Sequence, residues 1–98
     1  MGQIINELKT LQENIQNFSE DKVQDIEDQT KNLFGELSKE AENLTTDGKE
    51  HAKDALENAK KSVDELSRQG NEAKQNLSQE ALDKLRKLND TIQEVRRK

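Results

Sequence analysis

A chain of 98 residues has room for one domain, and this chain contains few of the residues that build a large core. Hydrophobic residues make up only 29%, Trp and Tyr are absent, and charged residues make up 38%, so the composition argues against a globular core and predicts at most a thin apolar seam. The net charge of −5 speaks against nucleic acid as a partner, and the absence of cysteine excludes disulfides and thiol chemistry.

Charge is distributed unevenly along the chain. Residues 1–48 carry four lysines against eleven acidic residues, a net charge of −7, whereas residues 49–98 carry twelve basic against ten acidic residues, a net charge of +2. Basic residues at the end of a helix are stabilised by the helix dipole, which is the simplest interpretation of the basic C-terminal end. A second interpretation is that the acidic half packs on the basic half, within a hairpin or between antiparallel chains.

Apolar runs are too short to reach across a membrane, because none exceeds two residues. The first residues also lack the apolar core of a signal peptide. We therefore expect no transmembrane segment and take the cytoplasm as the default location. The expected partners are a lipid surface or other proteins, including further copies of this chain.

The first predicted helix covers residues 3–45. Its apolar stripe follows an 11-residue (hendecad) repeat, in which positions separated by eleven residues share one helix face. A heptad also fits residues 4–18, but it fails inward at Lys22 and Asp25, whereas the 11-residue spacing continues. The stripe residues in this half are Leu8, Leu11, Ile15, Ile26, Leu33, Leu37 and Leu44.

The midpoint of the chain allows two interpretations. Asp47 followed by Glu50 resembles a capping box, which would begin a new helix after a turn near residues 45–49. Gly48, however, lies in phase with the repeat, which favours a helix that runs through without a turn. We therefore keep a continuous helix and an antiparallel helical hairpin as open alternatives.

The second predicted helix covers residues 48–97, with a weaker stop signal at Gln69-Gly70-Asn71. Small residues recur in phase with the repeat and predict close approach of a partner helix; they are Gly48, Ala59, Gly70 and Ala81. The larger apolar residues of this half are Leu66, Leu77, Leu85, Leu88 and Ile92. Together with those of the first half, they form the predicted apolar face for binding or packing.

The predicted fold class is all-α, as a single helical repeat region over residues 1–98. It consists of a long amphipathic helix with hendecad repeats, either continuous or folded as an antiparallel hairpin near residues 45–49. The seam between residues 41 and 74 is made largely of Ala and Gly, so it buries few methylene groups. Since an isolated helix depends on packing of its apolar face, we expect the free monomer to be partly disordered.

Catalytic and metal-binding constellations are missing from the sequence. His51 is the only histidine, and a metal site needs several converging ligands. The 21 carboxylates are expected on the exposed arc of the helix, where no pocket would shift their pKa values. No phosphate-binding loop or nucleophile motif appears. We therefore expect no enzymatic activity and no cofactor.

A family resemblance is carried by two segments, Gly48-Lys-Glu-His-Ala-Lys-Asp-Ala-Leu-Glu-Asn58 and Ala55-Leu-Glu-Asn-Ala-Lys-Lys-Ser-Val-Asp-Glu65. They resemble the 11-residue repeats of group 3 late embryogenesis abundant proteins, which are similar to the amphipathic repeats of exchangeable apolipoproteins. The resemblance covers residues 41–88 best, and residues 1–40 depart from it. It implies lipid binding by an amphipathic helix, disorder in dilute solution, and stress protection of membranes and proteins.

We therefore expect a non-enzymatic amphipathic-helix protein that binds or protects membrane or protein surfaces. Lysines on one flank of the stripe can reach lipid headgroups while their stems cover hydrocarbon; they include Lys9, Lys31, Lys49, Lys53 and Lys60. The alternative is a structural coiled-coil or helical-hairpin module that mediates homo-oligomerisation or binds a partner helix.

Overall fold

The computed structural model describes residues 2–97, except for the side chains of residues 71 and 72, and shows an all-helical chain. This confirms the predicted all-α class. The α-helices are α1 (Gly2–Gln16), α2 (Val23–Glu42), α3 (Thr46–Arg68) and α4 (Asn71–Arg97), and a short 3₁₀ helix, η1 (Glu20–Lys22), precedes α2. The continuous helix is therefore wrong. Each of the predicted helices 3–45 and 48–97 is divided in two by a turn.

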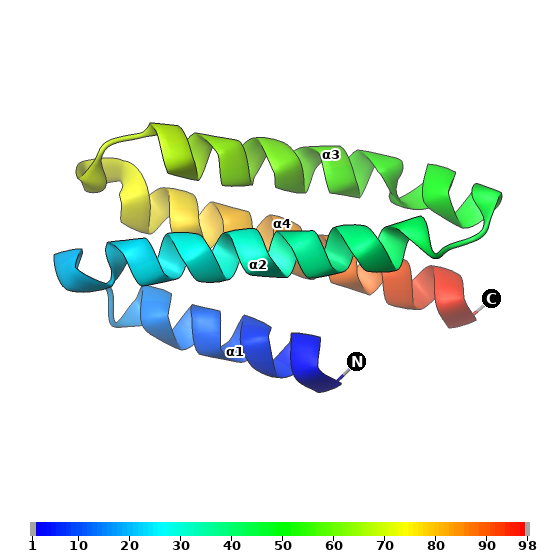
Figure 1. Cartoon of the computed structure of the whole chain (residues 1–98), viewed down its shortest axis with the longest axis horizontal. Coiled ribbons are helices and arrows are strands. Elements are labelled where there is room, and N and C mark those ends of the chain that lie inside the picture. Colours follow the sequence, from blue (N-terminus) through cyan, green and yellow to red (C-terminus); the bar gives the residue numbers. More distant parts are fainter. Residues whose placement is uncertain (1, 98) are drawn as a thin grey trace.

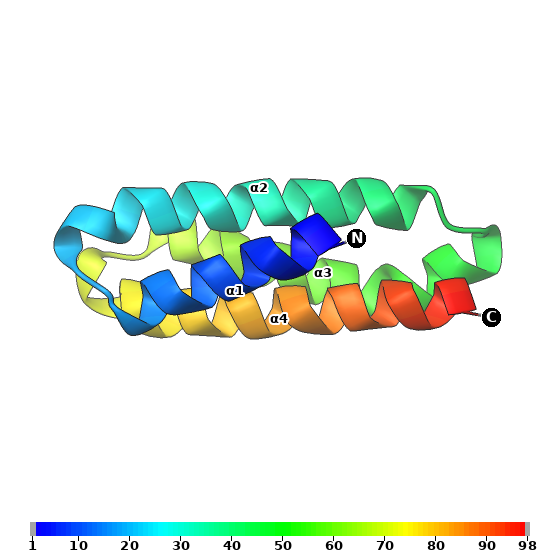
Figure 2. The ribbon, with the colours of Figure 1, turned by 90° about the horizontal axis from the view of Figure 1, so that it is seen from below.

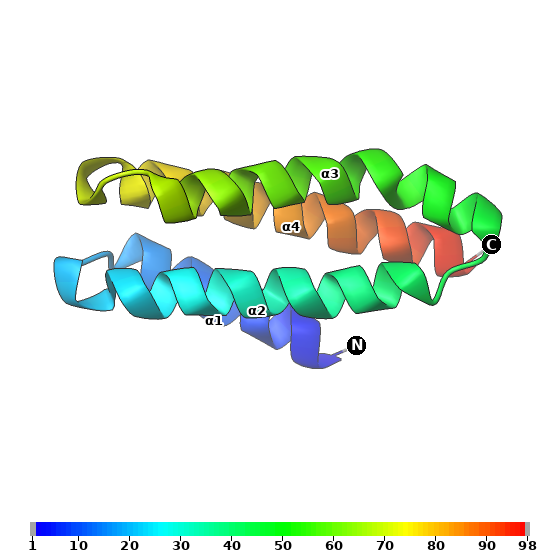
Figure 3. The same ribbon diagram turned by 45° about the horizontal axis from the view of Figure 1, so that its top comes forward.

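The four α-helices form an elongated bundle in which each helix runs antiparallel to the one before it (Figure 1). The turn between α2 and α3 lies at one end of the bundle, and the other two turns lie at the opposite end (Figure 3). α2 and α4 contact each other, and both α1 and α3 pack against this pair. α1 lies across part of α2 and α4, with α3 behind them (Figure 2).

The turn before α3 is capped by Thr45 rather than by Asp47. Thr45 has an extended backbone, with φ −63° and ψ 167°, and its Oγ1 accepts a hydrogen bond from the Gly48 backbone N–H at 3.2 Å. Satisfying an N–H of the first turn in this way is the usual role of a threonine N-cap. The chain thus turns at residues 43–45, and Asp47 lies inside the first turn of α3, where a negative charge suits the helix dipole.

The turn between α1 and α2 was not predicted from the sequence. Ser19 has an extended backbone there, with φ −148° and ψ 158°, and Glu20 and Asp21 follow it in the first turn of η1. A serine followed by acidic residues is a helix-start pattern. The failure of the heptad at Lys22 therefore marks this turn, rather than a change of repeat within one helix.

The expectation that no core forms is wrong. Seventeen hydrophobic residues are buried among those that the structure describes. The physical reason is that four narrow stripes, each too thin to stabilise a helix alone, meet along a common axis. The buried hydrophobic residues are Ile4, Leu8, Leu11, Ile15, Ile26, Leu33, Leu37, Ala41, Ala52, Ala59, Val63, Leu66, Ala81, Leu82, Leu85, Leu88 and Ile92.

Small buried residues bring α3 close to α4. Gly48, Ala52, Ala59 and Ser62 all face inward from α3, and the contact between α3 and α4 is the most extensive in the bundle. Because these side chains are short, the two backbones can approach without displacing larger groups. α3 and α4 therefore form the most extensive helix–helix contact of the fold.

Substitution of Gly48 tests this close approach. A Cβ at Gly48 would lie 2.7 Å from Val95 Cγ1 and 3.1 Å from Leu44 Cβ, so Gly48→Ala should destabilise the bundle by about 1 kcal/mol despite the higher helix propensity of alanine. At Gly35 in α2 a Cβ would meet nothing within 4 Å, so Gly35→Ala should stabilise by about 1 kcal/mol. Urea unfolding followed by circular dichroism measures both. Stabilisation by both substitutions would contradict close packing at Gly48.

Candidate functional site

The predicted apolar face lies inside the bundle. Leu44 and Leu77 are partly buried, and the other larger residues predicted for this face are buried: Leu8, Leu11, Ile15, Ile26, Leu33, Leu37, Leu66, Leu85, Leu88 and Ile92. Together they span all four helices. The surface that was predicted to bind a partner is therefore occupied by the chain itself.

The small residues of the repeat divide into two groups. Gly48, Ala59 and Ala81 are buried in the helix contacts described above. Gly70 is exposed in the turn between α3 and α4, and a Cβ added there would meet nothing within 4 Å. The prediction of close helix approach is therefore wrong at Gly70, which follows the C-terminal end of α3, consistent with the weaker stop signal in the sequence.

The outer surface offers little apolar area. Ile5 of α1, 49% exposed, is the one large hydrophobic side chain exposed among the described residues. No α-helix within the described part of the chain combines the length and apolarity needed to cross a membrane.

Several polar side chains interrupt the apolar interior. The Thr30 hydroxyl donates to the Ile26 carbonyl oxygen at 2.7 Å, which satisfies it within its own helix. The residue Ser78 is 1% exposed, and its hydroxyl has no hydrogen-bond partner. Asn89 is also buried. A buried hydroxyl without a partner costs about 1–3 kcal/mol, so this interior is weaker than its leucine content suggests.

Two ion pairs join α2 to α4. Lys74 pairs with Glu27, and its ammonium group also donates to the Leu66 carbonyl oxygen in the last turns of α3, so one side chain links three helices. The Lys74 and Glu27 side chains are only 8% and 12% exposed. The second pair, Arg96 with Glu40, lies nearer the surface, with side chains 32% and 34% exposed. The acidic half of the chain thus meets the basic half.

Sequence reasoning missed these four charged residues as interhelix contacts. Lys74 nevertheless carried a signal, because it occupies a repeat position, eleven residues after Val63 and eleven before Leu85, which is otherwise mostly apolar. A lysine in an apolar position points either to a defect of the repeat or to a buried cation with a partner. The structure shows that Lys74 is a buried cation with a partner, Glu27.

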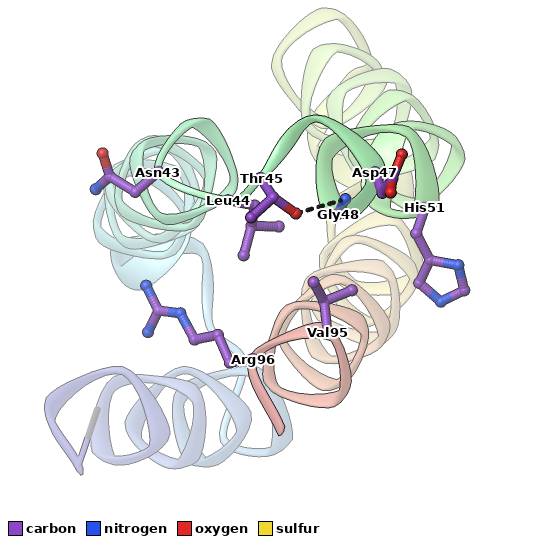
Figure 4. Close-up of a pocket in the computed structure, with 8 residues that line it drawn as sticks. All are labelled: Asn43, Leu44, Thr45, Asp47, Gly48, His51, Val95 and Arg96. Carbon is purple, nitrogen blue, oxygen red and sulfur yellow. Dashed lines mark hydrogen bonds between the residues drawn. The ribbon is translucent and has the colours of Figure 1, made fainter. Parts of the chain in front are cut away.

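A cavity of about 580 Å³ lies where the α2–α3 turn meets the end of α4. Leu44 and Val95 point into the space between the three helices, whereas Asn43 and His51 point outward on opposite sides (Figure 4). The Thr45 cap and Gly48 form the upper wall (Figure 4). Leu44 is only partly buried at this end of the bundle, whereas the leucines in its middle are fully buried.

α1 and α2 meet along a polar seam. The Asn14 amide of α1 donates to the Gln29 side-chain oxygen of α2 at 2.9 Å. Beside this hydrogen bond lies a cleft of about 480 Å³, whose lining is mostly amide and hydroxyl side chains: Gln3, Asn6, Glu7, Thr10, Gln29, Asn32 and Leu33.

The Glu7 carboxyl is the one group whose ionisation is clearly shifted among the described residues. A hydrogen bond with Glu36, burial and repulsion by the Glu36 charge raise the pKa of Glu7, while a hydrogen bond from Gln3 lowers it. The oxygen Oε2 of Glu7 is buried and has no donor nearby.

No cluster of three or more potential metal ligands of the His, Cys, Asp and Glu types occurs within residues 2–97 where the structure describes them. His51 is exposed on α3. Comparison with protein families, curated proteins and solved structures finds no match to this chain. The candidate site is therefore the apolar interior, together with the polar contacts that hold it closed.

Proposed function

We propose that this protein is a non-enzymatic amphipathic-helix protein that binds lipid surfaces by opening its bundle. The observation that carries this proposal is the burial of almost the whole apolar stripe inside helices whose outer faces are charged. A closed bundle offers a lipid surface little more than Ile5. After opening, each helix would present one apolar face to acyl chains and one charged face to water.

One way to open the bundle is to separate the α1–α2 pair from the α3–α4 pair, which exposes the apolar faces of both pairs. It leaves the extensive α3–α4 contact intact. The hinge would be residues 43–45, the only connection between the two pairs, and the cavity beneath this turn leaves room for backbone rotation. Opening would break both α2–α4 ion pairs, so these pairs oppose it.

Exposed lysines support the choice of an anionic lipid surface. Lys9, Lys31, Lys49, Lys53 and Lys60, predicted to flank the stripe, are all exposed. Their ammonium groups could contact phosphate headgroups while the neighbouring apolar residues enter the acyl region. The protective role implied by the resemblance to late embryogenesis abundant repeats is an extension of the same proposal, since a helix that covers a membrane shields it.

The alternative, a module for homo-oligomerisation or partner-helix binding, requires a free apolar face. The described surface offers one exposed large hydrophobic residue, Ile5, because the stripe is used within the chain. We therefore favour lipid binding over assembly. Sedimentation of the free protein tests the homo-oligomerisation branch of the alternative, since that branch requires a concentration-dependent oligomer.

The test measures how fast the protein binds vesicles that contain phosphatidylglycerol, using Phe34→Trp as a fluorescent reporter of a residue packed on the core. If opening limits binding, a more stable bundle must bind more slowly. Ser78→Ala removes the unpartnered hydroxyl, and we expect it to slow binding roughly three- to tenfold. Lys74→Met, which breaks the buried ion pair without removing apolar surface, should accelerate binding at least about tenfold.

Lys87→Met is the matched control, because it removes an exposed lysine from the same helix. Its binding rate should stay close to that of the reporter protein. Equal rates for Ser78→Ala, Lys74→Met and Lys87→Met would show that the closed bundle binds directly, and no binding to any vesicle would overturn lipid binding itself. Circular dichroism without vesicles reports how much helix the free monomer of each variant retains.

A further inference from the structure

We infer that a groove between α1 and α4 binds the phosphate headgroup of an anionic lipid while the bundle is still closed. The groove has a volume of about 280 Å³. The residues that line it are Ile5, Leu8 and Lys9 of α1 and Arg86, Asn89 and Asp90 of α4. This inference rests on the proposed lipid binding, and it adds the place at which the closed chain first contacts the bilayer.

The groove opens on an outer face of the bundle. α1 and α4 contact each other, and no other helix covers them from the side seen in Figure 2. Ile5 lies beside the buried stripe of α1 and is 49% exposed, whereas Leu8, which belongs to the stripe, is 6% exposed. A bilayer surface can therefore reach the groove without any movement of the helices.

Two cations line the groove from opposite helices. Lys9 and Arg86 outnumber Asp90, the one acid among the described residues of the lining, so the groove is locally cationic in a chain with a net charge of −5. The ion pairs between α2 and α4 use other cations, Lys74 and Arg96. Lys9 and Arg86 can thus donate to a phosphate, which a guanidinium group binds through two parallel hydrogen bonds.

Ile5 favours a lipid over a free phosphate as the ligand. A single exposed isoleucine is common on protein surfaces and needs no explanation by itself. Ile5, however, precedes Lys9 by four residues, so the two side chains lie on the same side of α1, and both line the groove. A free phosphate has no apolar part for Ile5 to contact, whereas a lipid carries acyl chains beside its phosphate. Apolar side chains next to cations are what interfacial helices use to bind membranes.

The groove also lies on the boundary between the two helix pairs that separate when the bundle opens. A lipid acyl chain that follows its headgroup into the groove would contact Leu8 and replace part of the contact between α1 and α4. The open chain offers such a lipid more apolar surface than the closed chain does, so binding at the groove favours opening.

Stopped-flow binding of the Phe34→Trp reporter protein to phosphatidylglycerol vesicles, over a series of lipid concentrations, tests this site. If the closed bundle contacts lipid at the groove and then opens, the binding rate rises with lipid concentration towards a limit that opening sets. Lys9→Gln/Arg86→Gln should raise the half-saturating lipid concentration roughly tenfold and leave the limiting rate within about twofold. Ile5→Ser should raise the half-saturating concentration about three- to tenfold.

Lys61→Gln/Lys87→Gln is the matched control, because it removes two exposed lysines elsewhere and gives the chain the same net charge as Lys9→Gln/Arg86→Gln. Its half-saturating concentration should rise less than about threefold. An equal rise in both double variants would overturn the groove as the site, since it would reflect only the net charge. An unchanged value for Ile5→Ser would overturn the lipid and leave a site for phosphate alone.

Failure of this inference differs from failure of the proposed function. If the reporter protein binds no vesicle, lipid binding itself is overturned. If all variants bind with the half-saturating concentration of the reporter protein, lipid binding stands and the groove is wrong. Lys9, Arg86 and Ile5 lie outside the buried core cluster, so we expect their variants to fold, which circular dichroism without vesicles checks. A variant that fails to fold leaves the other as the test.

Discussion

Lys74→Met is expected to lower the free energy of unfolding by about 3–5 kcal/mol, which is a large share of the total for a domain of this size. The Lys74 ammonium group neutralises Glu27 in a place where the two side chains are only 8% and 12% exposed, and it also donates to the Leu66 carbonyl oxygen. Methionine retains most of the lysine stem but leaves the Glu27 carboxylate without its cation. Urea unfolding followed by circular dichroism measures the loss.

Two further variants show whether burial is the cause. In Glu27→Leu/Lys74→Met the stranded carboxylate is gone, so most of the lost stability should return. Arg96→Met breaks the other α2–α4 ion pair, whose side chains are 32% and 34% exposed, and should cost about 1 kcal/mol or less because solvent screens that pair. Equal losses for Lys74→Met and Arg96→Met would contradict the distinction between a buried and a superficial contact.

The helical class and most inward-facing residues followed from periodicity, but the number of helices did not. Ile15 and Ile26 are eleven residues apart and both buried, yet the α1–α2 turn lies between them. The same is true of Leu37 and Gly48 across the α2–α3 turn. An 11-residue spacing of buried residues therefore does not distinguish one long helix from several helices that share a core.

The turns were only partly visible in the sequence: Thr45 caps α3 with its side chain, whereas Ser19 makes no side-chain cap hydrogen bond. The sequence predicts a turn near residues 45–49 only as one of two open alternatives, with the cap at Asp47 instead of Thr45, and a stop at residues 69–71 only as a weaker signal. The turn at Ser19 was missed, because the repeat appeared to continue through it. Without proline, a serine or threonine cap is a weak signal, since these residues also occur on exposed helix faces.

The polar contacts could not be predicted, because they depend on the register between helices. Asn14 meets Gln29, and Glu27 meets Lys74, through pairings set by the way the stripes pack. The sequence showed only that one half is acidic and the other basic. The order of the free monomer and the lipid-binding role stay predictions, and both depend on how easily these contacts open.

Leu85→Ala is expected to lower the free energy of unfolding by about 2–5 kcal/mol, at least about twice the loss for Leu77→Ala. In the sequence the two leucines are equivalent members of one apolar face of the same helix. In the folded chain Leu85 is 0% exposed and belongs to the central apolar cluster, whereas Leu77 is only partly buried and lies outside it. Truncating Leu85 leaves a cavity among neighbours that cannot all move inward, and truncating Leu77 lets water replace part of the side chain.

The comparison of these two leucines separates the bundle from the single amphipathic helix in solution. A lone helix exposes both side chains, so both substitutions would cost little and alanine would even favour the helix. The closed bundle requires that Leu85→Ala and Leu77→Ala lower the free energy of unfolding by unequal amounts. Urea unfolding at one fixed protein concentration measures both losses. Equal, small losses would mean that the free chain does not adopt the closed bundle. Opening at a lipid surface would then no longer be needed, because the apolar stripe would already be exposed.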